Sequence, residues 1–300
     1  MTEFSPSRHS GAPQRPIVDA HTHIFPPEFA RDRSSIGVRD EWFAGLYQSP
    51  KSLLASEEDI LASMDEAGFT FSIVCGFPWK DAGLCREHND YLLEVAARHP
   101  GRIAVVATVS PMQRGAAQEA ERCLKAGAVG IGELNADAQG FDLNDPGPLA
   151  TVAAVCRGLG RPILFHVSEP VGHLYPGKGS STPDRLLRFL LEFPELTVVA
   201  AHWGGGLPFY ELMPEVAEQT RNVVYDSAAS TYLYRSHVFP TVIDLVGSDR
   251  VMMATDYPVL RQDRFVKRIE KHNLSDDVMD AILWRNAARV YGLRLEGVGQ

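Results

Sequence analysis

Short apolar runs alternate with stretches of helical periodicity along most of the chain. The runs are nearly continuous instead of alternating with polar residues, which is typical of parallel strands covered on both faces. After a first strand at residues 17–25, they predict strands at residues 71–77, 103–109, 129–134, 163–167, 196–201, 223–225 and 251–254. Apolar residues at helical spacing predict intervening helices at about residues 84–98, 113–126, 148–159, 183–193, 208–220, 236–246 and 261–271.

This pattern predicts an α/β fold with eight strands, each followed by a helix. Eight such units in 300 residues favour a single closed (β/α)₈ barrel of the TIM type over an open doubly wound sheet, because such a barrel typically takes about 250 residues. We assign the barrel to residues 16–293, with a C-terminal helix at about 276–291. Tails are predicted at residues 1–15, as a disordered segment without the apolar core of a signal peptide, and at 294–300.

The segment after the first strand is too long for an ordinary connection. Residues 25–55 include Trp42, Leu46 and Tyr47 without a clear period, so we expect an irregular, lid-like insertion. A helix is then predicted over 56–68, because a serine and three acidic residues open it and a glycine closes it.

Composition limits the partners of this protein. The formal charge is −9, from 29 basic and 38 acidic residues, and no basic cluster is present, which argues against nucleic acid and anionic membrane surfaces. No apolar run approaches the roughly 18 residues that a transmembrane helix needs. We therefore expect a cytoplasmic protein. The cysteines lack C-x-x-C spacing and are predicted to be free, buried thiols in a reducing compartment: Cys75, Cys85, Cys123 and Cys156.

Residues that can bind metal stand at the ends of five predicted strands. Strand spacing puts His21 and His23 on one face, with Asp19 beside them, where Asp19 either orients a ligand or caps a turn. Because barrel active sites lie at the C-terminal strand ends, and imidazole is the commonest metal ligand, we predict a mono- or dinuclear metal site. The candidate residues, in chain order, are His21, His23, Glu133, His166, His202 and Asp256.

Four motifs at these strand ends resemble the amidohydrolase superfamily. They are Asp-Ala-His-Thr-His at 19–23, Phe-His at 165–166, Ala-His-Trp-Gly-Gly-Gly-Leu-Pro at 201–208 and Thr-Asp-Tyr-Pro at 255–258. More narrowly, they are similar to the amidohydrolase-2 branch, which holds lactone and amide hydrolases beside decarboxylases of the aminocarboxymuconate-semialdehyde type. The resemblance extends from residue 16 over nearly the whole chain.

The resemblance implies roles for these side chains. His21, His23 and Asp256 would hold the principal metal, and His166 would be a further ligand. His202 would either bind metal or donate a hydrogen bond to substrate. A homodimer is also implied by the resemblance alone.

The number and identity of the ions depend on the remaining donors. Many superfamily members bridge two metals with a carboxylated lysine, which this sequence lacks; Glu133 instead resembles the bridging glutamate of TatD-type nucleases. Nitrogen and oxygen donors suit Zn²⁺ first, then Mn²⁺, Co²⁺ or Fe²⁺. One or two ions are compatible with this set.

Hydrolysis is the function that this ligand set favours. The metal would lower the pKa of a bound water toward ~7, and Asp256 would act as general acid and base on a small-molecule ester, lactone or amide. The alternative is non-oxidative decarboxylation of an aromatic or unsaturated carboxylic acid, with Asp256 protonating carbon. A non-catalytic metal-binding protein is disfavoured, because the proton-transfer residue accompanies the ligands.

Substrate-binding candidates lie near the predicted mouth. The glycine-rich loop after the fifth strand offers His173, Tyr175 and Lys178, of which Lys178 either pairs with a substrate carboxylate or stays solvated. Trp203 and Trp79 either stack on an aromatic substrate or pack in the interior. The remaining histidines of the helical stretches are predicted to be surface residues: His88, His99, His237 and His272.

Overall fold

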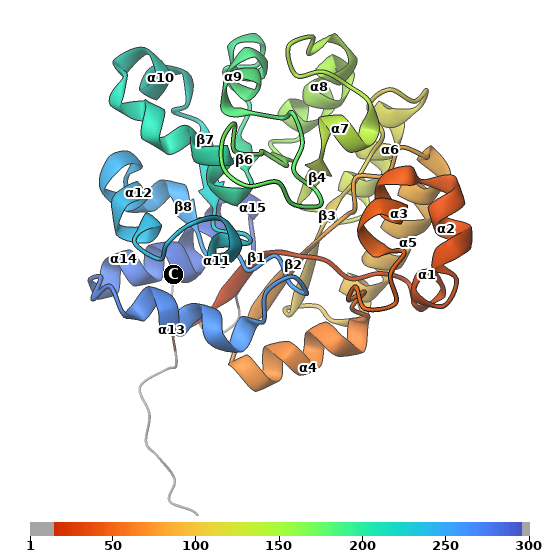
Figure 1. The fold of residues 1–300 in the computed structure, drawn as a ribbon, viewed down its shortest axis with the longest axis horizontal. Coiled ribbons are helices and arrows are strands. Elements are labelled where there is room, and N and C mark those ends of the chain that lie inside the picture. Colours follow the sequence, from red (N-terminus) through yellow and green to blue (C-terminus); the bar gives the residue numbers. More distant parts are fainter. Residues whose placement is uncertain (1–14, 296–300) are drawn as a thin grey trace, which may run out of the picture.

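Eight strands pair in chain order in the computed structural model, which describes residues 15–295, and each strand is parallel to its neighbours. The sheet closes on itself: the Ala20 amide donates to the Met253 carbonyl at 3.0 Å, and Thr22 bridges in parallel to Tyr257. The helices surround the strands (Figure 1), so the predicted (β/α)₈ barrel is confirmed. The strands are β1 Val18–Thr22, β2 Phe71–Cys75, β3 Ile103–Ala107, β4 Gly130–Leu134, β5 Ile163–Phe165, β6 Val198–Ala200, β7 Val223–Asp226 and β8 Val251–Met252.

The connecting helices lie within or close to the predicted segments. The predicted helix at 208–220 is divided between a 3₁₀ segment, His202–Leu212, and α10, and the last helix is interrupted by a π-helical turn, Ala281–Arg285. The helices after β2 are α5 Ala82–Arg98, α6 Ala116–Lys125, α7 Ala136–Gln139, α8 Ala150–Gly158, α9 Pro183–Glu192, α10 Pro214–Gln219, α11 Ser230–Leu233, α12 Val238–Val246, α13 Phe265–Glu270, α14 Asp276–Asp280 and α15 Asn286–Tyr291.

Helix α4, Glu57–Ala67, begins and ends where the sequence predicts. The Ser56 side chain accepts from the Asp59 amide and the Asp59 side chain accepts from the Ser56 amide, which forms a capping box. Gly68 ends the helix in the left-handed region at φ 76°. The sequence was sufficient to predict both ends of this helix, because each cap is formed by residues a few positions apart in the chain.

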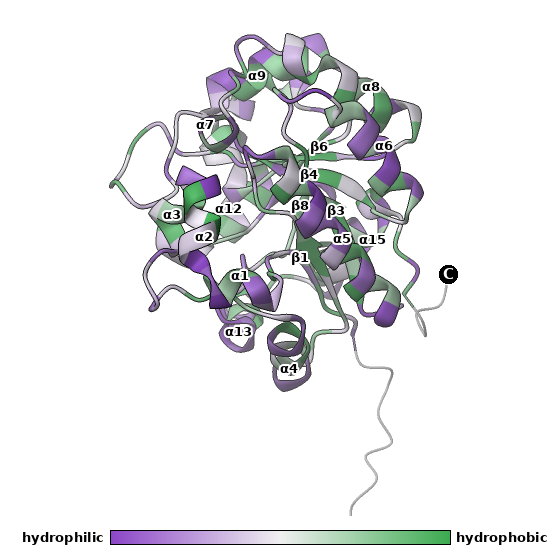
Figure 2. Ribbon diagram, turned by 90° about the vertical axis from the view of Figure 1, so that its right-hand side faces the viewer, coloured by the Kyte–Doolittle hydropathy of each residue, from purple (hydrophilic) through white to green (hydrophobic). Residues whose placement is uncertain are grey.

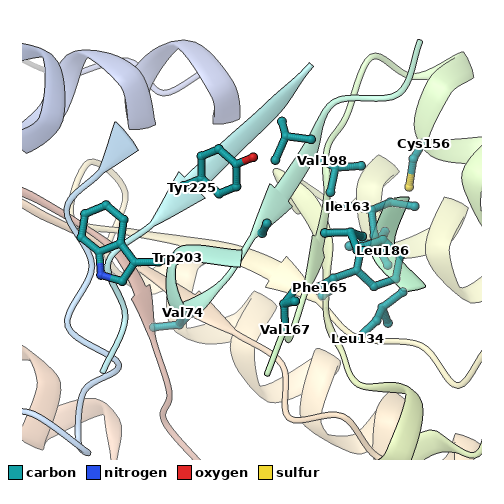
Figure 3. Close-up of a cluster of buried hydrophobic side chains, with 14 of the residues drawn as sticks. Val74, Leu134, Cys156, Ile163, Phe165, Val167, Leu186, Val198, Trp203 and Tyr225 are labelled. Carbon is teal, nitrogen blue, oxygen red and sulfur yellow. The ribbon is translucent and has the colours of Figure 1, made fainter. Parts of the chain in front are cut away.

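Both faces of the sheet are buried, as the continuous apolar runs predict. Consecutive residues of β6 face opposite ways: Val199 packs with Ile73 and Met252 inside the barrel, whereas Val198 packs with Leu186 of α9 in the outer layer. Figure 3 shows part of this outer layer, and Figure 2 shows the hydrophobic strands at the centre with hydrophilic residues over the outer helices. The site must therefore lie at the strand ends, where the packed layers stop.

The segment that was predicted to be irregular is helical. It forms α1 Pro27–Arg31, α2 Arg33–Arg39 and α3 Glu41–Tyr47, which lie together on one side of the barrel (Figure 1). Asp32 and Asp40 start the second and third helices by accepting hydrogen bonds from the Ser35 and Phe43 amides. Each helix is too short to show a hydrophobic period in sequence, and burial of residues such as Phe43 stabilises them.

His88 lies in the core under this segment, so its prediction as a surface residue is wrong. Its side chain is fully buried, its Nδ1 accepts from the Trp79 indole N–H at 3.0 Å, and its Nε2–H donates to the Ile24 carbonyl at 2.8 Å. Trp79 is likewise buried against Phe77 and Phe43, which decides its packing role. The neutral imidazole satisfies both partners, and burial lowers the pKa of His88 to about 4.

We expect His88 to make folding sensitive to acid. In the unfolded chain its pKa is about 6.5, so between pH 6.5 and 4 the unfolded state binds more protons and the free energy of unfolding falls as pH is lowered, by up to about 3 kcal/mol. Urea unfolding of metal-free protein at several pH values would measure this slope. His88→Gln keeps one donor and one acceptor and should flatten the slope; equal slopes in both proteins would contradict the prediction.

The chain ends lie mostly outside the described residues. Arg15, within the predicted N-terminal tail, forms ion pairs with Asp280 at 2.6 Å and Asp276 at 2.7 Å, so this end of the tail is held against α14. Residues 1–14 and 296–300 are not described. Across residues 15–295, no helix combines the length and apolarity needed to cross a membrane. The four cysteines are free and buried, as predicted.

Candidate metal centre and active-site cavity

A first group of donors combines β1 with the end of β8. The Nε2 atoms of His21 and His23 lie 3.1 Å apart, and Asp256 Oδ1 lies 3.5 Å from His23 Nε2 and 4.0 Å from His21 Nε2. Each residue offers one atom to a set that fits within 4.8 Å. Strand pairing between the first and last strands of the closed barrel brings these distant residues together, because the Asp256 amide donates to the His21 carbonyl.

A second group comes from the ends of β4, β5 and β6. Glu133 Oε1 lies 2.8 Å from His166 Nδ1 and 3.3 Å from His202 Nε2. The other oxygen, Oε2, lies 3.6 Å from the Nε2 atoms of both His21 and His23. Glu133 therefore contacts both groups, and all six residues predicted from the sequence converge at one end of the barrel.

The far sides of the rings are held by acceptors. His21 Nδ1 donates to Asp226 Oδ2 at 2.9 Å, His23 Nδ1 to the Cys75 carbonyl at 3.1 Å, and His202 Nδ1 to the Ala228 carbonyl at 3.2 Å. A neutral imidazole that donates from Nδ1 presents a lone pair at Nε2. Two such lone pairs facing each other at 3.1 Å require a cation between them, either a proton or a metal ion.

The pKa values of His21 and Glu133 also reflect the need for positive charge between these side chains. Burial by itself lowers the pKa of His21, but the carboxylates of Asp226 and Glu133 outweigh it and raise that pKa well above its ordinary value. Burial by itself raises the pKa of Glu133, whereas His21 and His166 pull it well below its ordinary value. A metal ion would replace the proton on His21, so metal binding and protonation compete here. The donor set therefore fits a divalent cation.

Asp226 is a residue of the site that the sequence analysis missed. It ends β7, is fully buried, and accepts from the His202 and Ala228 amides through Oδ1 while Oδ2 contacts His21. The predicted strand stopped at Tyr225, so Asp226 was not among the residues predicted to end a strand. The signal was available, because Asp226 is a polar residue that ends an apolar strand, like the residues that were found.

Asp19 lies near the site but does not share the face of the two histidines. The pairing of β1 with β2 shifts register between Asp19 and Thr22, so simple alternation fails there. The Asp19 carboxylate accepts from the Thr255 amide, the Thr255 hydroxyl and the Gln262 side chain at 2.9, 2.6 and 2.8 Å. It thereby holds the backbone next to the candidate ligand Asp256, in line with the first of its two predicted roles.

The turn after β6 has a strained backbone conformation. His202 and Trp203 adopt φ values of 58° and 59°, in the left-handed region that disfavours residues with a Cβ. Three glycines follow, and a Cβ on Gly205 would lie 2.4 Å from the Ser168 carbonyl oxygen. Close approach of this turn to the loop after β5 therefore requires glycine, and it brings His202 next to His166.

A cavity of about 280 Å³ opens above both groups of donors. His23, Glu133, His166, His202 and Asp256 form its polar floor. The walls are largely apolar and aromatic and come from α3, the loop after β2, the loop after β5 and the segment around α11: Trp42, Leu46, Tyr47, Phe77, Pro78, Tyr175, Pro176, Tyr232 and Leu233. The helical insertion after β1 thus supplies one wall, in agreement with its predicted position over the site.

Besides Trp79, four substrate-binding candidates were predicted, of which two lie at this cavity and two do not. His173 and Tyr175 line it, and the Tyr175 hydroxyl donates to Glu169 at 2.9 Å. Trp203 is fully buried in the outer hydrophobic layer (Figure 3), where its N–H donates to Ser230 at 2.7 Å. Lys178 turns back on its own loop. Of the two alternatives for Trp203, the packing role describes its position, and neither Trp203 nor Lys178 lines the cavity, as their substrate-binding alternatives would require.

The fold and this set of ligands define a class of barrel enzymes with metal-binding residues at the strand ends. The chain belongs to the amidohydrolase family, whose model matches residues 18–293. This confirms the resemblance inferred from the motifs.

Curated and solved relatives narrow the comparison. A gamma-resorcylate decarboxylase from a Polaromonas species is 27% identical over 253 residues, which cover 69% of this chain and 76% of the relative. The 5-carboxyvanillate decarboxylase of Sphingomonas paucimobilis superposes with a TM-score of 0.79 at 19% identity, over 94% of this chain and all of that structure. A dihydroxybenzoic acid decarboxylase from Polaromonas, solved with manganese and 2-nitroresorcinol, superposes with a TM-score of 0.69 at 21% identity. The match covers 93% of this chain and 97% of that structure.

These comparisons contradict the predicted hydrolase. The named relatives are decarboxylases, which favours the alternative reading of the same ligand set. The prediction was wrong because the candidate metal ligands are compatible with both kinds of reaction and do not by themselves distinguish hydrolysis from decarboxylation.

Proposed function

We propose that this protein is a metal-dependent carboxy-lyase that removes carbon dioxide from a hydroxylated aromatic acid without oxidation. The observation that carries the proposal is the 27% identity to a gamma-resorcylate decarboxylase over most of both chains. The cavity supports it independently. Its aromatic and apolar walls suit a flat ring, and its polar floor suits the carboxylate.

The metal would be held by the donors at the strand ends. His21, His23 and Asp256 would bind one ion, with His166 as a further ligand, and Glu133 with His202 would either complete this sphere or hold a second ion. When bound, a divalent cation supplies positive charge for the substrate carboxylate. Zinc stays a prediction, and the manganese in a structural relative makes Mn²⁺ the first ion to test. Metal analysis of purified protein would separate one ion per chain from two.

Asp256 is the proposed proton donor. Its side chain is 13% exposed and lines the cavity floor beside His23. In its protonated form it donates H⁺ to the ring carbon that bears the carboxylate, and a ring hydroxyl supplies the electron density that this carbon needs. The bond between ring and carboxylate carbon then breaks, its electron pair returns to the ring, and CO₂ leaves. Neither water nor an oxidant is consumed.

Product analysis in D₂O tests this reaction. Manganese-loaded protein would be incubated with hydroxybenzoates, lactones and amides, and the products examined by mass spectrometry. We expect CO₂ release with one deuterium at the vacated ring carbon. Products that instead gain the elements of water would overturn the proposal, as would the absence of CO₂ from every hydroxylated aromatic acid.

Asp226→Asn should weaken metal binding about 10- to 100-fold. The substitution keeps the shape of the side chain but removes the charge that orients His21 and raises the basicity of its ring. Competition with a chelator would measure the affinity, and circular dichroism would verify the fold. An unchanged affinity in a folded variant would show that Asp226 serves only the backbone amides of His202 and Ala228.

A further inference from the structure

The cavity walls carry no permanent positive charge. Among residues 15–295, those that line the cavity include neither lysine nor arginine, whereas Glu133 and Asp256 are both present on its floor. The positive charge available to an anionic substrate is therefore confined to the metal-binding floor. A second anionic group on the substrate would face the apolar walls.

Lys178, the lysine of the loop that covers the cavity, is engaged elsewhere. Its Nζ donates to the carbonyl oxygens of Val171 and His173 at 2.5 and 3.2 Å, within its own loop. The side chain is half-buried and is not among the cavity-lining residues. Moving the Lys178 side chain into the cavity would break both hydrogen bonds. Lys178 is therefore not a preformed partner for a second carboxylate on the substrate.

The walls do offer neutral hydrogen-bond donors. The Tyr47 hydroxyl has no hydrogen-bond partner among the described residues, although Tyr47 lines the cavity and its ring packs against Phe25 and Phe77. Asn135 also lines the cavity, and its Oδ1 already accepts from two amides of α7, which leaves the NH₂ group as its free end. Such groups suit phenolic oxygens more than a carboxylate, which needs charge compensation when it is buried.

We propose that the substrate is a hydroxylated aromatic acid with a single carboxylate, the one that is lost, and that substrates with a second ring carboxylate are rejected. This inference rests on the proposed function. The named relatives do not settle it, because 5-carboxyvanillate carries two carboxylates whereas gamma-resorcylate carries one. The specificity arises from the absence of a compensating cation and not from the size of the cavity.

Matched pairs of ligands test the inference. Hydroxybenzoates would be compared with the hydroxyisophthalates that differ only by a second carboxylate, at pH 8, where an imidazole of ordinary pKa is neutral. Both kcat/KM and the Kd of manganese-loaded protein would be measured. We expect the second carboxylate to lower kcat/KM and raise Kd by about 100-fold or more.

A gain-of-function variant separates charge from size. Leu46 lies on α3 at the cavity wall, close to Gly177 of the opposite loop. Leu46→Arg adds a cation there. It should reduce the ratio of the Kd of the dicarboxylate to the Kd of the monocarboxylate at least about tenfold, whereas the uncharged control Leu46→Gln should leave that ratio unchanged.

The two measurements distinguish the inference from the proposed function. Equal Kd values for a pair in the wild-type protein, or tighter binding of the dicarboxylate, would overturn the inference even if CO₂ is released. If the monocarboxylate binds more tightly than the dicarboxylate but no ligand releases CO₂, the result would support selectivity for a single carboxylate and would refute the proposed carboxy-lyase function. If Leu46→Arg and Leu46→Gln reduce the ratio of the two Kd values equally, size and not charge excludes the second carboxylate.

Discussion

Replacing Asp256 by asparagine should lower kcat about 10²- to 10⁴-fold, the range expected when a general acid is lost. The amide has nearly the same shape as the carboxylic acid but cannot deliver its proton. Asp256 lies on the cavity floor 3.5 Å from His23 Nε2, next to the place where the substrate carboxylate would bind. Decarboxylation rates with saturating Mn²⁺ would measure the effect.

Saturating metal matters because Asp256 also belongs to the first donor group. If weaker metal binding were the entire cause, excess Mn²⁺ would restore the rate, whereas loss of the proton donor predicts that the rate stays low. Asp263→Asn is a suitable control, because Asp263 follows in the same part of the chain and pairs with Arg261 on the surface. A rate for Asp256→Asn within tenfold of the wild type would exclude the proposed role.

His23→Ala should reduce metal affinity by more than about 100-fold and abolish activity at ordinary metal concentrations. The expected loss of metal affinity is larger than for a residue that only donates or accepts a hydrogen bond to a ligand, since loss of such a hydrogen bond typically lowers metal affinity about 10- to 100-fold. His23 contributes the Nε2 atom that faces His21 at 3.1 Å, and its side chain is only 8% exposed. Elemental analysis after dialysis and chelator competition would measure the change.

The matched control for His23→Ala is His237→Ala, since His237 is exposed and lies on no wall of the cavity. Purified protein with a full complement of metal after His23→Ala would contradict the ligand assignment. Loss of metal from both variants would point to general destabilisation, which unfolding measurements would reveal.

The sequence was informative wherever structure depends on neighbouring residues. The caps of α4 at Ser56 and Gly68 and the order of strands and helices were predicted correctly, because they follow from local hydrogen bonds and local hydrophobic periodicity. Chain closure was also predictable, since eight repeated strand-helix units leave few other arrangements. Strand lengths were not predictable: β8 extends only from Val251 to Met252, because the next two amides donate to the Ile282 carbonyl and the Ser227 hydroxyl instead of to a neighbouring strand.

The errors share a different cause. His88 was assigned to the surface, yet its neighbours Trp79 and Ile24 come from other elements, and only packing decides that it is buried. Asp19 was expected to share a face with His21, but a register shift in β1 breaks the alternation. The homodimer and the cytoplasmic location remain predictions.

By itself, the sequence predicted the candidate metal-binding residues and their position at one end of the barrel. Each of His21, His23, Glu133, His166 and Asp256 stands at the end of a predictable strand, and parallel strands in a barrel bring their ends together whatever the loops do. Tertiary structure alone decided what lies above them. The cavity joins α3, the loop after β5 and the segment around α11, whose mutual positions depend on long-range packing that no local pattern encodes. The candidate ligands suit both hydrolysis and decarboxylation, so residues at the strand ends could be predicted from the sequence although they did not distinguish the two reactions, of which the decarboxylase relatives favour the second.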